Sequence, residues 1–366
     1  MDNFFIPLDL SKFPKMDTEL EKDKIIQATK QVNKLLKDSH SLAKLDHCYY
    51  CGKKVSSFCN SHFVPAFCLR NIADNGKVNY MNTIIDLPVL KENKGVKDSG
   101  TFRLICRDCD SKIFQDYENP DNYNASPSMK MLSQISMKNN LKFIEKRRSE
   151  LELYNLMKNL AGDSPMADFL DQKNVVSTLD LKEFEDSFLY DKNCDLTPSD
   201  SCYSLALFQE LPYKVPLAFQ GFIALITDID GGVINDIYNL DPQYIIKNLS
   251  LCVFPLKDRS IIIMFVEKDN LRYNDFFSQL KQFSLNEQLQ IINYIIFAYC
   301  EDYFLSPLLS KDTLDKLRAT AGKTSDLAIF PSQTTSTGLN AMKTIYNYSD
   351  RFSIPNLLSE KYCINL

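Results

Sequence analysis

The chain has 366 residues, of which 45% are hydrophobic and 24% charged, so it has enough apolar side chains for folded domains and is not typical of a disordered protein. Its formal net charge of -5 excludes the strongly basic composition of histone-like nucleic-acid binders, although a local basic surface would suffice to hold phosphates. No apolar stretch approaches the roughly 18 residues of a membrane-spanning helix, so we expect no membrane partner.

The helices expected in the first half flank a cysteine-rich region. Apolar residues recur at helical spacing over 17–45, which predicts a packing or capping helix. Polar residues 121–127 follow Pro120 and indicate a linker. A long helix is expected over 128–161, because Gly162 is a natural C-cap, and a short helical connector over 165–200.

The second half predicts an antiparallel sheet followed by helices. Apolar runs rich in Ile, Val and Phe are typical of strands, and they cover 203–210, 218–228, 232–238, 249–256 and 260–267. Asp230, Gly231 and Gly232 would form one hairpin turn, and residues 257–259 another. Helices are expected over 274–283, 286–305 and 311–321, the second of them opened by a capping box of Ser284 and Glu287.

Two pairs of cysteines carry the strongest chemical signal. Cys48 and Cys51 are separated by two residues, and Gly52 allows the tight turn of a zinc knuckle. Cys106 and Cys109 lie where a predicted strand meets a predicted helix, whose first N–H groups favour thiolates. We predict that the four thiolates bind one structural zinc ion, which would contribute about 10 kcal/mol to folding.

The number of cysteines also bears on location. The chain has eleven Cys and no basic start or long apolar run typical of a signal peptide. An odd cysteine count in such a chain predicts a reducing, cytoplasmic location. The alternative to a shared zinc, two unrelated redox or buried pairs, lacks a thioredoxin-like sequence context.

A histidine lies between the two cysteine pairs. His62 falls in a predicted strand and is followed by Pro65, a Gly-containing loop and then the second pair with Asp110 and Lys112. Over about residues 46–120 this order resembles the zinc-stabilised HNH (ββα-metal) endonucleases. The resemblance implies a treble-clef module around a catalytic divalent metal, Mg²⁺ or Mn²⁺, separate from the structural zinc.

The resemblance also implies roles for single residues. His62 corresponds to the general base, Asp110 to a ligand of the catalytic metal at the start of the helix, and Lys112 to a common lysine. Ser61 stands where an acidic residue or a histidine is typical of the family. Glu118 follows Asp110 by two helical turns, about 12 Å by helix rise, so we do not expect both carboxylates to share one ion.

A basic run lies in the middle of the helix expected over 128–161. It consists of Lys138, Lys142, Lys146, Arg147 and Arg148. Such runs are often solvated helix faces, but the last four side chains are also candidates for contacts with nucleic-acid phosphates.

Together the elements predict an α+β fold of four parts. These are an N-terminal helical segment (1–45), a zinc-bound ββα module (46–125), a helical connector (126–200) and a C-terminal domain of antiparallel sheet and helices (201–366).

Two functions from different classes follow. The first is a metal-dependent nuclease, with DNA favoured over RNA, whose C-terminal domain senses a signal or binds a protein partner. By analogy of layout alone, this resembles effectors of bacterial antiviral defence. The second is a non-catalytic zinc module that binds nucleic acid or protein. A catalytic site requires His62 and Asp110 to face one open pocket, which separates the two hypotheses.

Overall fold

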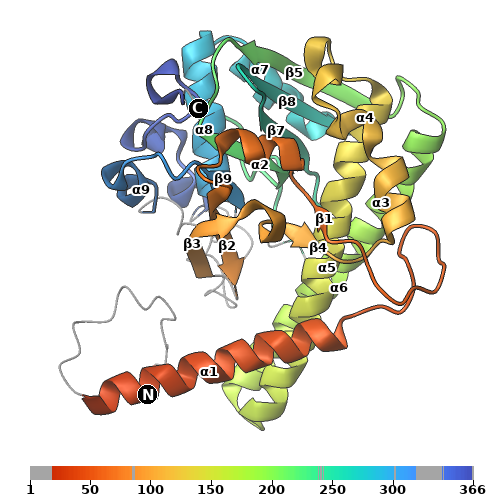
Figure 1. Cartoon of the computed structure of the whole chain (residues 1–366), viewed down its shortest axis with the longest axis vertical. Coiled ribbons are helices and arrows are strands. Elements are labelled where there is room, and N and C mark those ends of the chain that lie inside the picture. The colour runs from red at the N-terminus through yellow and green to blue at the C-terminus, as the bar shows by residue number, and fades with distance from the viewer. Residues whose placement is uncertain are drawn as a thin grey trace. The chain divides into compact units, whose positions relative to one another are not determined.

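The computed structural model describes residues 19–84, 87–237, 239, 241, 243–300, 302–318, 340 and 342–364. It divides the chain into two compact units, whose elements are labelled in Figure 1. The first, here called the arm unit, consists of the residues up to Leu45 together with 146–181. The second, the core unit, consists of 46–145 together with 182–366. Of the predicted helix ends, residues 17, 18 and 319–321 lie outside the described residues.

The arm unit is helical. Its first helix, α1 (Glu19–Leu42), confirms the helix predicted at the N-terminus. The other two, α5 (Met129–Ala161) and α6 (Pro165–Leu196), also take part in the core unit. Gly162 ends α5 with a left-handed φ of +59°, as predicted for a C-cap. The connector expected over 165–200 is not short, because α6 is one helix of 32 residues.

The core unit contains a seven-stranded sheet with the order β3-β2-β9-β6-β7-β8-β5, and every neighbouring pair is antiparallel. The predicted antiparallel sheet is therefore confirmed. The strands are β2 (Lys77–Ile84), β3 (Leu87–Gly95), β5 (Tyr203–Leu211), β6 (Leu217–Ile223), β7 (Leu249–Pro255), β8 (Ser260–Glu267) and β9 (Tyr303–Leu305).

Two layers of helices cover the two faces of this sheet. Leu251 and Val253 of β7 belong to one large apolar cluster with α7 (Asn274–Leu280) and α8 (Leu285–Tyr299). Since side chains alternate along a strand, Phe254 points to the opposite face, where it contacts Phe67 of α2 (Ala66–Ile72). On that face, Phe222 of β6 stacks near α5 and α6. The central strands β6, β7 and β8 are thus buried between two helical layers.

Several predicted boundaries change in the structure. Residues 232–237 do not form a strand; only an isolated bridge joins Thr227 to Val233 around the predicted turn. The helix expected over 286–305 ends at Tyr299, and its last residues form β9 instead. The predicted capping box is confirmed, since the Ser284 N–H donates to Glu287. The third expected helix is α9 (Lys311–Arg318).

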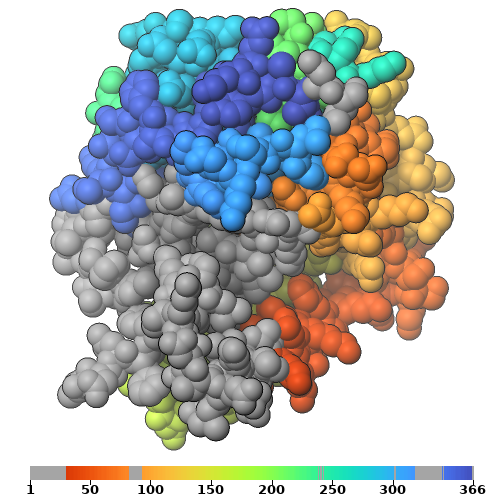
Figure 2. All heavy atoms as spheres, turned by 60° about the vertical axis from the view of Figure 1, so that its left-hand side comes forward, coloured from red at the N-terminus to blue at the C-terminus, as the bar shows by residue number. Residues whose placement is uncertain are grey.

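The outer strands of the sheet come from the cysteine-rich region. β2 and β3 lie between the two cysteine pairs in sequence, and β2 pairs with β9 through Tyr80 and Phe304. These two segments are far apart in sequence but adjacent in space. Figure 2 shows orange atoms of the cysteine-rich region directly beside blue atoms of the C-terminal segment. Among the described residues, no helix has both the length and the apolarity needed to cross a membrane.

Candidate metal centre and histidine face

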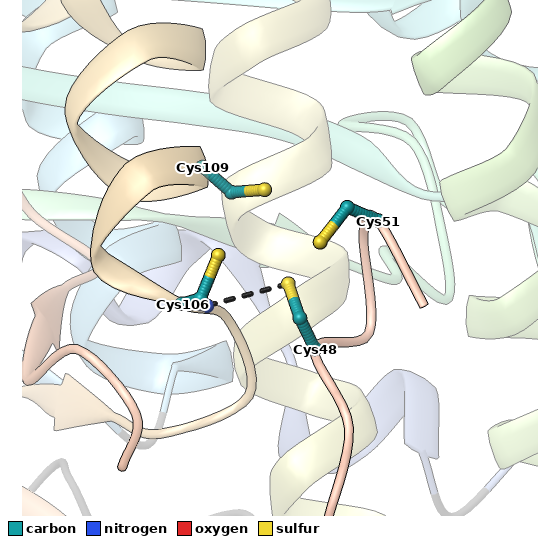
Figure 3. A group of neighbouring side chains, drawn as sticks. All are labelled: Cys48, Cys51, Cys106 and Cys109. Atoms are coloured by element: carbon teal, nitrogen blue, oxygen red, sulfur yellow. Dashed lines mark hydrogen bonds between the residues drawn. The ribbon is translucent and has the colours of Figure 1, made fainter. Parts of the chain in front are cut away.

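Four cysteine sulfurs come together at the end of a short helix. Cys106 and Cys109 lie at the N-terminus of α3 (Arg107–Ile113). Cys48 and Cys51 lie in the knuckle loop near the start of the core unit, far from α3 in sequence. Figure 3 shows the four thiols pointing toward one another. All four sulfurs lie within 4.8 Å of one another. They form the one group of three or more such ligand side chains found within the described part of the chain.

The backbone of the knuckle is arranged by its sequence. Gly52 has a left-handed φ of +69°, and its N–H donates to the Cys48 carbonyl at 2.8 Å. An L side chain is strained in this conformation, so glycine permits the turn that brings Cys51 back toward Cys48. The Cys106 N–H also donates to the Cys48 sulfur at 3.3 Å, which links the knuckle to the start of α3.

The thiols differ in how easily they ionise. A hydrogen bond from the backbone of Lys53 is the main reason that the pKa of Cys51 is lowered to about 7. Burial raises the pKa of Cys48, and burial together with the neighbouring thiols raises that of Cys109. Binding of a cation would therefore have to displace protons from the buried thiols.

The geometry of the four sulfurs fits zinc. Tetrahedral Zn–S bonds of about 2.3 Å place sulfurs roughly 3.8 Å apart, which a slight closing of the group would give. All four ligands are soft thiolate donors, and no position remains open for a substrate. The cluster that was predicted from the sequence is therefore present, and its chemistry suits a structural metal.

The two short strands that precede α3 form a β-pair with two different faces. β1 (Ser61–His62) pairs with β4 (Thr101–Phe102), and Ser61 lies opposite Phe102. Both of these side chains are buried, whereas His62 and Thr101 on the other face are partly exposed. The alternation of a strand thus sends adjacent Ser61 and His62 to opposite sides.

On the exposed side, one hydrogen bond selects the tautomer of the neutral imidazole. The Nε2 atom of His62 lies 2.9 Å from the carbonyl oxygen of Val96. A carbonyl can only accept, so Nε2 carries the proton and Nδ1 of the neutral ring keeps its lone pair. Among the described residues, none forms a hydrogen bond with Nδ1.

Asn60 and Arg103 complete this exposed side, here called the histidine face with His62 and Thr101. The Arg103 Nε donates to the Asn60 side-chain oxygen at 3.3 Å, and the Asn60 amide donates to the Lys97 carbonyl at 3.0 Å. Asn60 therefore orients the Arg103 guanidinium, which is a preferred partner of phosphate oxygens. Arg103 was not predicted from the sequence, although its position opposite Asn60 follows from the register of the β-pair.

On the buried side, Asp110 is held by three donors. Its Oδ1 accepts from the Ser61 hydroxyl at 2.5 Å and from the Lys138 ammonium at 3.1 Å, and its Oδ2 accepts from the Cys59 thiol at 3.2 Å. Burial raises the pKa of Asp110, but Lys138 and the hydrogen bonds outweigh it, so the pKa lies below its ordinary value. Asp110 and His62 do not meet in one pocket, so Asp110 does not face the imidazole as the expected ligand of a shared catalytic metal would.

Glu118 lies closer to Asp110 than the helical spacing suggested. α3 ends at Ile113, Phe114 has non-helical φ/ψ, and α4 (Gln115–Glu118) starts in a new direction. Glu118 consequently reaches the same ammonium, with its Oε1 2.8 Å from the Lys138 Nζ. The separation of about two helical turns expected from the sequence assumed a continuous helix and is not found, since both carboxylates contact one ammonium.

The basic run of α5 is paired within the protein. Lys142, Lys146 and Arg147 are only 11%, 19% and 23% exposed, respectively, which leaves little surface for phosphates. The phosphate contacts expected of this run are therefore not supported. Its partners are Asp302 for Lys142, Glu150 for Lys146, Asp180 for Arg147, and the Ala43 carbonyl for Arg148.

Comparison with known proteins adds no relative. No protein-family model, curated protein or solved structure matches this chain. The assignment of a function therefore rests on the residues and geometry described above.

Proposed function

We propose that the core unit is a zinc-stabilised phosphodiesterase that cleaves nucleic acid with His62 as the general base, but without the catalytic metal site of the HNH family, which would need His62 and Asp110 in one pocket. One observation carries the proposal: the hydrogen bond from Nε2 to the Val96 carbonyl leaves the Nδ1 lone pair of a partly exposed imidazole as a base. The neighbouring Arg103 supplies a positive charge on the same side of the β-pair.

The chemistry needs few groups. The Nδ1 of His62 takes a proton from the attacking hydroxyl, a new P–O bond forms, and the P–O bond to the leaving sugar oxygen breaks. The leaving oxygen takes a proton from water, and the Arg103 guanidinium offsets the charge on the phosphate oxygens. The role of zinc is to hold α3 against the knuckle. Asp110 has no part in the reaction, because it lies on the side of the β-pair opposite His62.

The choice of substrate follows from this chemistry. The resemblance favours DNA and a metal-activated water. On the described residues, however, His62 does not belong to a group of hard metal ligands. RNA carries its own nucleophile, the 2′-hydroxyl, and needs only a base and a positive charge. We therefore expect RNA to be cleaved in the presence of a chelator that leaves the thiolate-bound zinc in place.

The substitution His62→Ala tests the proposal on single-stranded and double-stranded RNA and DNA, with and without Mg²⁺ or Mn²⁺. Loss of a general base lowers rates by about 10²- to 10⁴-fold, and we expect a decrease of this size for the substrate that is cleaved. His47→Ala is the matched control, because His47 is exposed and pairs with Asp46 away from the β-pair. Equal cleavage by the wild type and His62→Ala would remove His62 from catalysis.

A second function is favoured by the engagement of Asp110 with Lys138, which leaves the site without the expected metal ligand. In this case the histidine face binds nucleic acid without cleaving it. The wild type would then bind labelled RNA or DNA intact, and Arg103→Ala would weaken binding while His47→Ala would not. Fluorescence anisotropy together with product analysis on the same samples separates the two functions.

A further inference from the structure

A buried ammonium occupies the place between the two acidic residues of the zinc module. Lys138 of α5 is 1% exposed, and its Nζ lies 2.8 Å from Glu118 and 3.1 Å from Asp110. The aromatic ring of Phe114 lies 4.0 Å from the same nitrogen. The stem of the lysine is packed inside the core unit, so the charge is fixed at one point rather than moving through solvent.

The groups around the Lys138 ammonium are of the kind that bind cations. Two carboxylates converge on it, the Ser61 hydroxyl donates to one of them, Asp110, and these oxygen groups are the type that hard divalent ions prefer. The carboxylates keep contact with water, since Asp110 is 21% and Glu118 is 36% exposed. A divalent ion could therefore reach the oxygens, but it would come close to a buried positive charge that cannot move away.

We propose that the Lys138 ammonium is the permanent cation of this site and stands in place of an exchangeable divalent metal. The lysine neutralises part of the acidic charge, and its two ion pairs link α5 to α3, which carries Cys109, and to α4. Without the ammonium, Asp110, Glu118 and Ser61 become ligands for a hard divalent ion. This inference does not depend on the proposed function, because it concerns the face of the β-pair opposite His62.

Binding of Mn²⁺ to the full-length, zinc-loaded protein tests the inference. Electron paramagnetic resonance of free Mn²⁺ gives the number bound, and thermal unfolding with and without Mn²⁺ gives the stabilisation. We expect no Mn²⁺ bound to the wild type, and one Mn²⁺ per chain bound to Lys138→Met with a raised unfolding temperature. The double variant Lys138→Met with Asp110→Asn should lose this binding.

The matched control is Lys142→Met. Lys142 is the next lysine of α5 and also forms a buried ion pair, with Asp302, away from Asp110 and Glu118. Its removal should create no Mn²⁺ site. A folded Lys138→Met protein that binds no Mn²⁺ would overturn the inference.

If Lys138→Met does not fold, the wild type still decides the question. Binding of one Mn²⁺ to the wild type that is abolished by Asp110→Asn would show that the metal, and not the ammonium, is the resident cation. Absence of Mn²⁺ binding to the wild type, alongside recovered folding of Lys138→Met when Mn²⁺ is present during refolding, would support the inference. His62→Ala should leave every one of these results unchanged, which separates them from the test of the phosphodiesterase.

Discussion

Two aspartates of the core unit, one partly and one fully buried, show how neighbours decide the charge of one residue type. Asp110 lies beside an ammonium, and its pKa is lowered. Asp191 of α6 is fully buried and accepts hydrogen bonds from two neutral side chains, Tyr203 and Asn140, each at 2.6 Å. Burial raises its pKa to about 8, because the hydrogen bonds do not compensate for the loss of water.

This raised pKa predicts a pH dependence of stability. The folded protein keeps the proton of Asp191 up to about pH 8, whereas the unfolded chain releases it near pH 4. The folded state therefore binds more protons in this range, and the free energy of unfolding should fall as the pH rises from 4 to 8, by at most about 1.4 kcal/mol per pH unit for this group. Asp191→Asn should flatten the slope in urea unfolding experiments.

The control for that experiment is an exposed carboxylate of the same helix. Asp186→Asn should leave the slope unchanged, because Asp186 is in contact with water in both states. Glu145, whose pKa burial raises to about 7, contributes to the wild-type slope as well. The comparison of the two asparagine variants with the wild type isolates the share of Asp191. An Asp191→Asn slope equal to that of the wild type would contradict the assignment.

At the scale of elements, Gly100 at the start of β4 lies in close contact with β9 of the large sheet. Gly100 has a φ of +59°, and its carbonyl accepts from the Phe63 N–H at 3.1 Å. A Cβ atom at this position would lie 2.2 Å from the ring of Phe304 in β9 and 2.7 Å from the ring of Phe63. Only glycine therefore allows β1, β4 and β9 to approach as they do.

Gly100→Ala should destabilise the protein by more than its backbone conformation alone explains. The left-handed conformation costs an alanine about 1–2 kcal/mol, and displacement of two packed rings adds about 1–3 kcal/mol. Gly76→Ala is the matched control, because Gly76 has a φ of +71° and nothing within 4 Å of the added Cβ. Chemical denaturation should give the larger loss for Gly100→Ala; equal losses would mean that the rings adapt without cost.

Much of the fold could be predicted from local patterns. The helices around Gly162 and Ser284, the strands β5, β7 and β8, and the cysteine cluster all follow from spacing and from capping residues. β9 was not separated from α8, because its apolar residues Tyr303–Leu305 follow the apolar helix closely in sequence, and the extended C-cap Cys300 carries no clear stop signal. The hairpin β2–β3 was not predicted, because polar residues such as Asn79 interrupt the apolar pattern of β2.

The candidate site shows the same limit. Its cysteines are recognisable because each pair is local, with two residues between the thiols. The role of Lys138 was not recognisable, because its partners Asp110 and Glu118 come from another part of the chain and from beyond a helix break. The same holds for Lys142, whose partner Asp302 is distant in sequence. The basic residues of a helix can be read from the sequence, but the acidic residues that pair with them in the folded protein cannot.

At the scale of the whole molecule, the cysteine cluster closes the loop that contains β1, α2, β2 and β3. The zinc expected there would stabilise the local β-pair and, through β2, one end of the large sheet. A structural zinc contributes about 10 kcal/mol at neutral pH, which is comparable with the net stability of a domain. Loss of the ion should therefore affect the sheet as well as the knuckle.

Removal of this metal should lower the unfolding temperature. We expect metal analysis to find one zinc per chain, and Cys109→Ser to lose it and to unfold at least about 10 °C lower, since each kcal/mol corresponds to roughly 2–4 °C for a domain of this size. Cys363→Ser is the control, because Cys363 lies outside the cluster. A purified protein without zinc and with an unchanged melting curve would contradict the metal centre.

The pairing of β2 with β9 has a consequence for synthesis on the ribosome. The edge of β2 that will receive β9 is made long before residues Tyr303–Leu305 leave the exit tunnel. During that interval the nascent chain carries an unpaired strand edge, the kind of surface on which other chains can pair and aggregate. Zinc taken up early by the four thiols would fix the base of the hairpin while its partner is still being translated, so metal supply during translation bears on yield as well as on final stability.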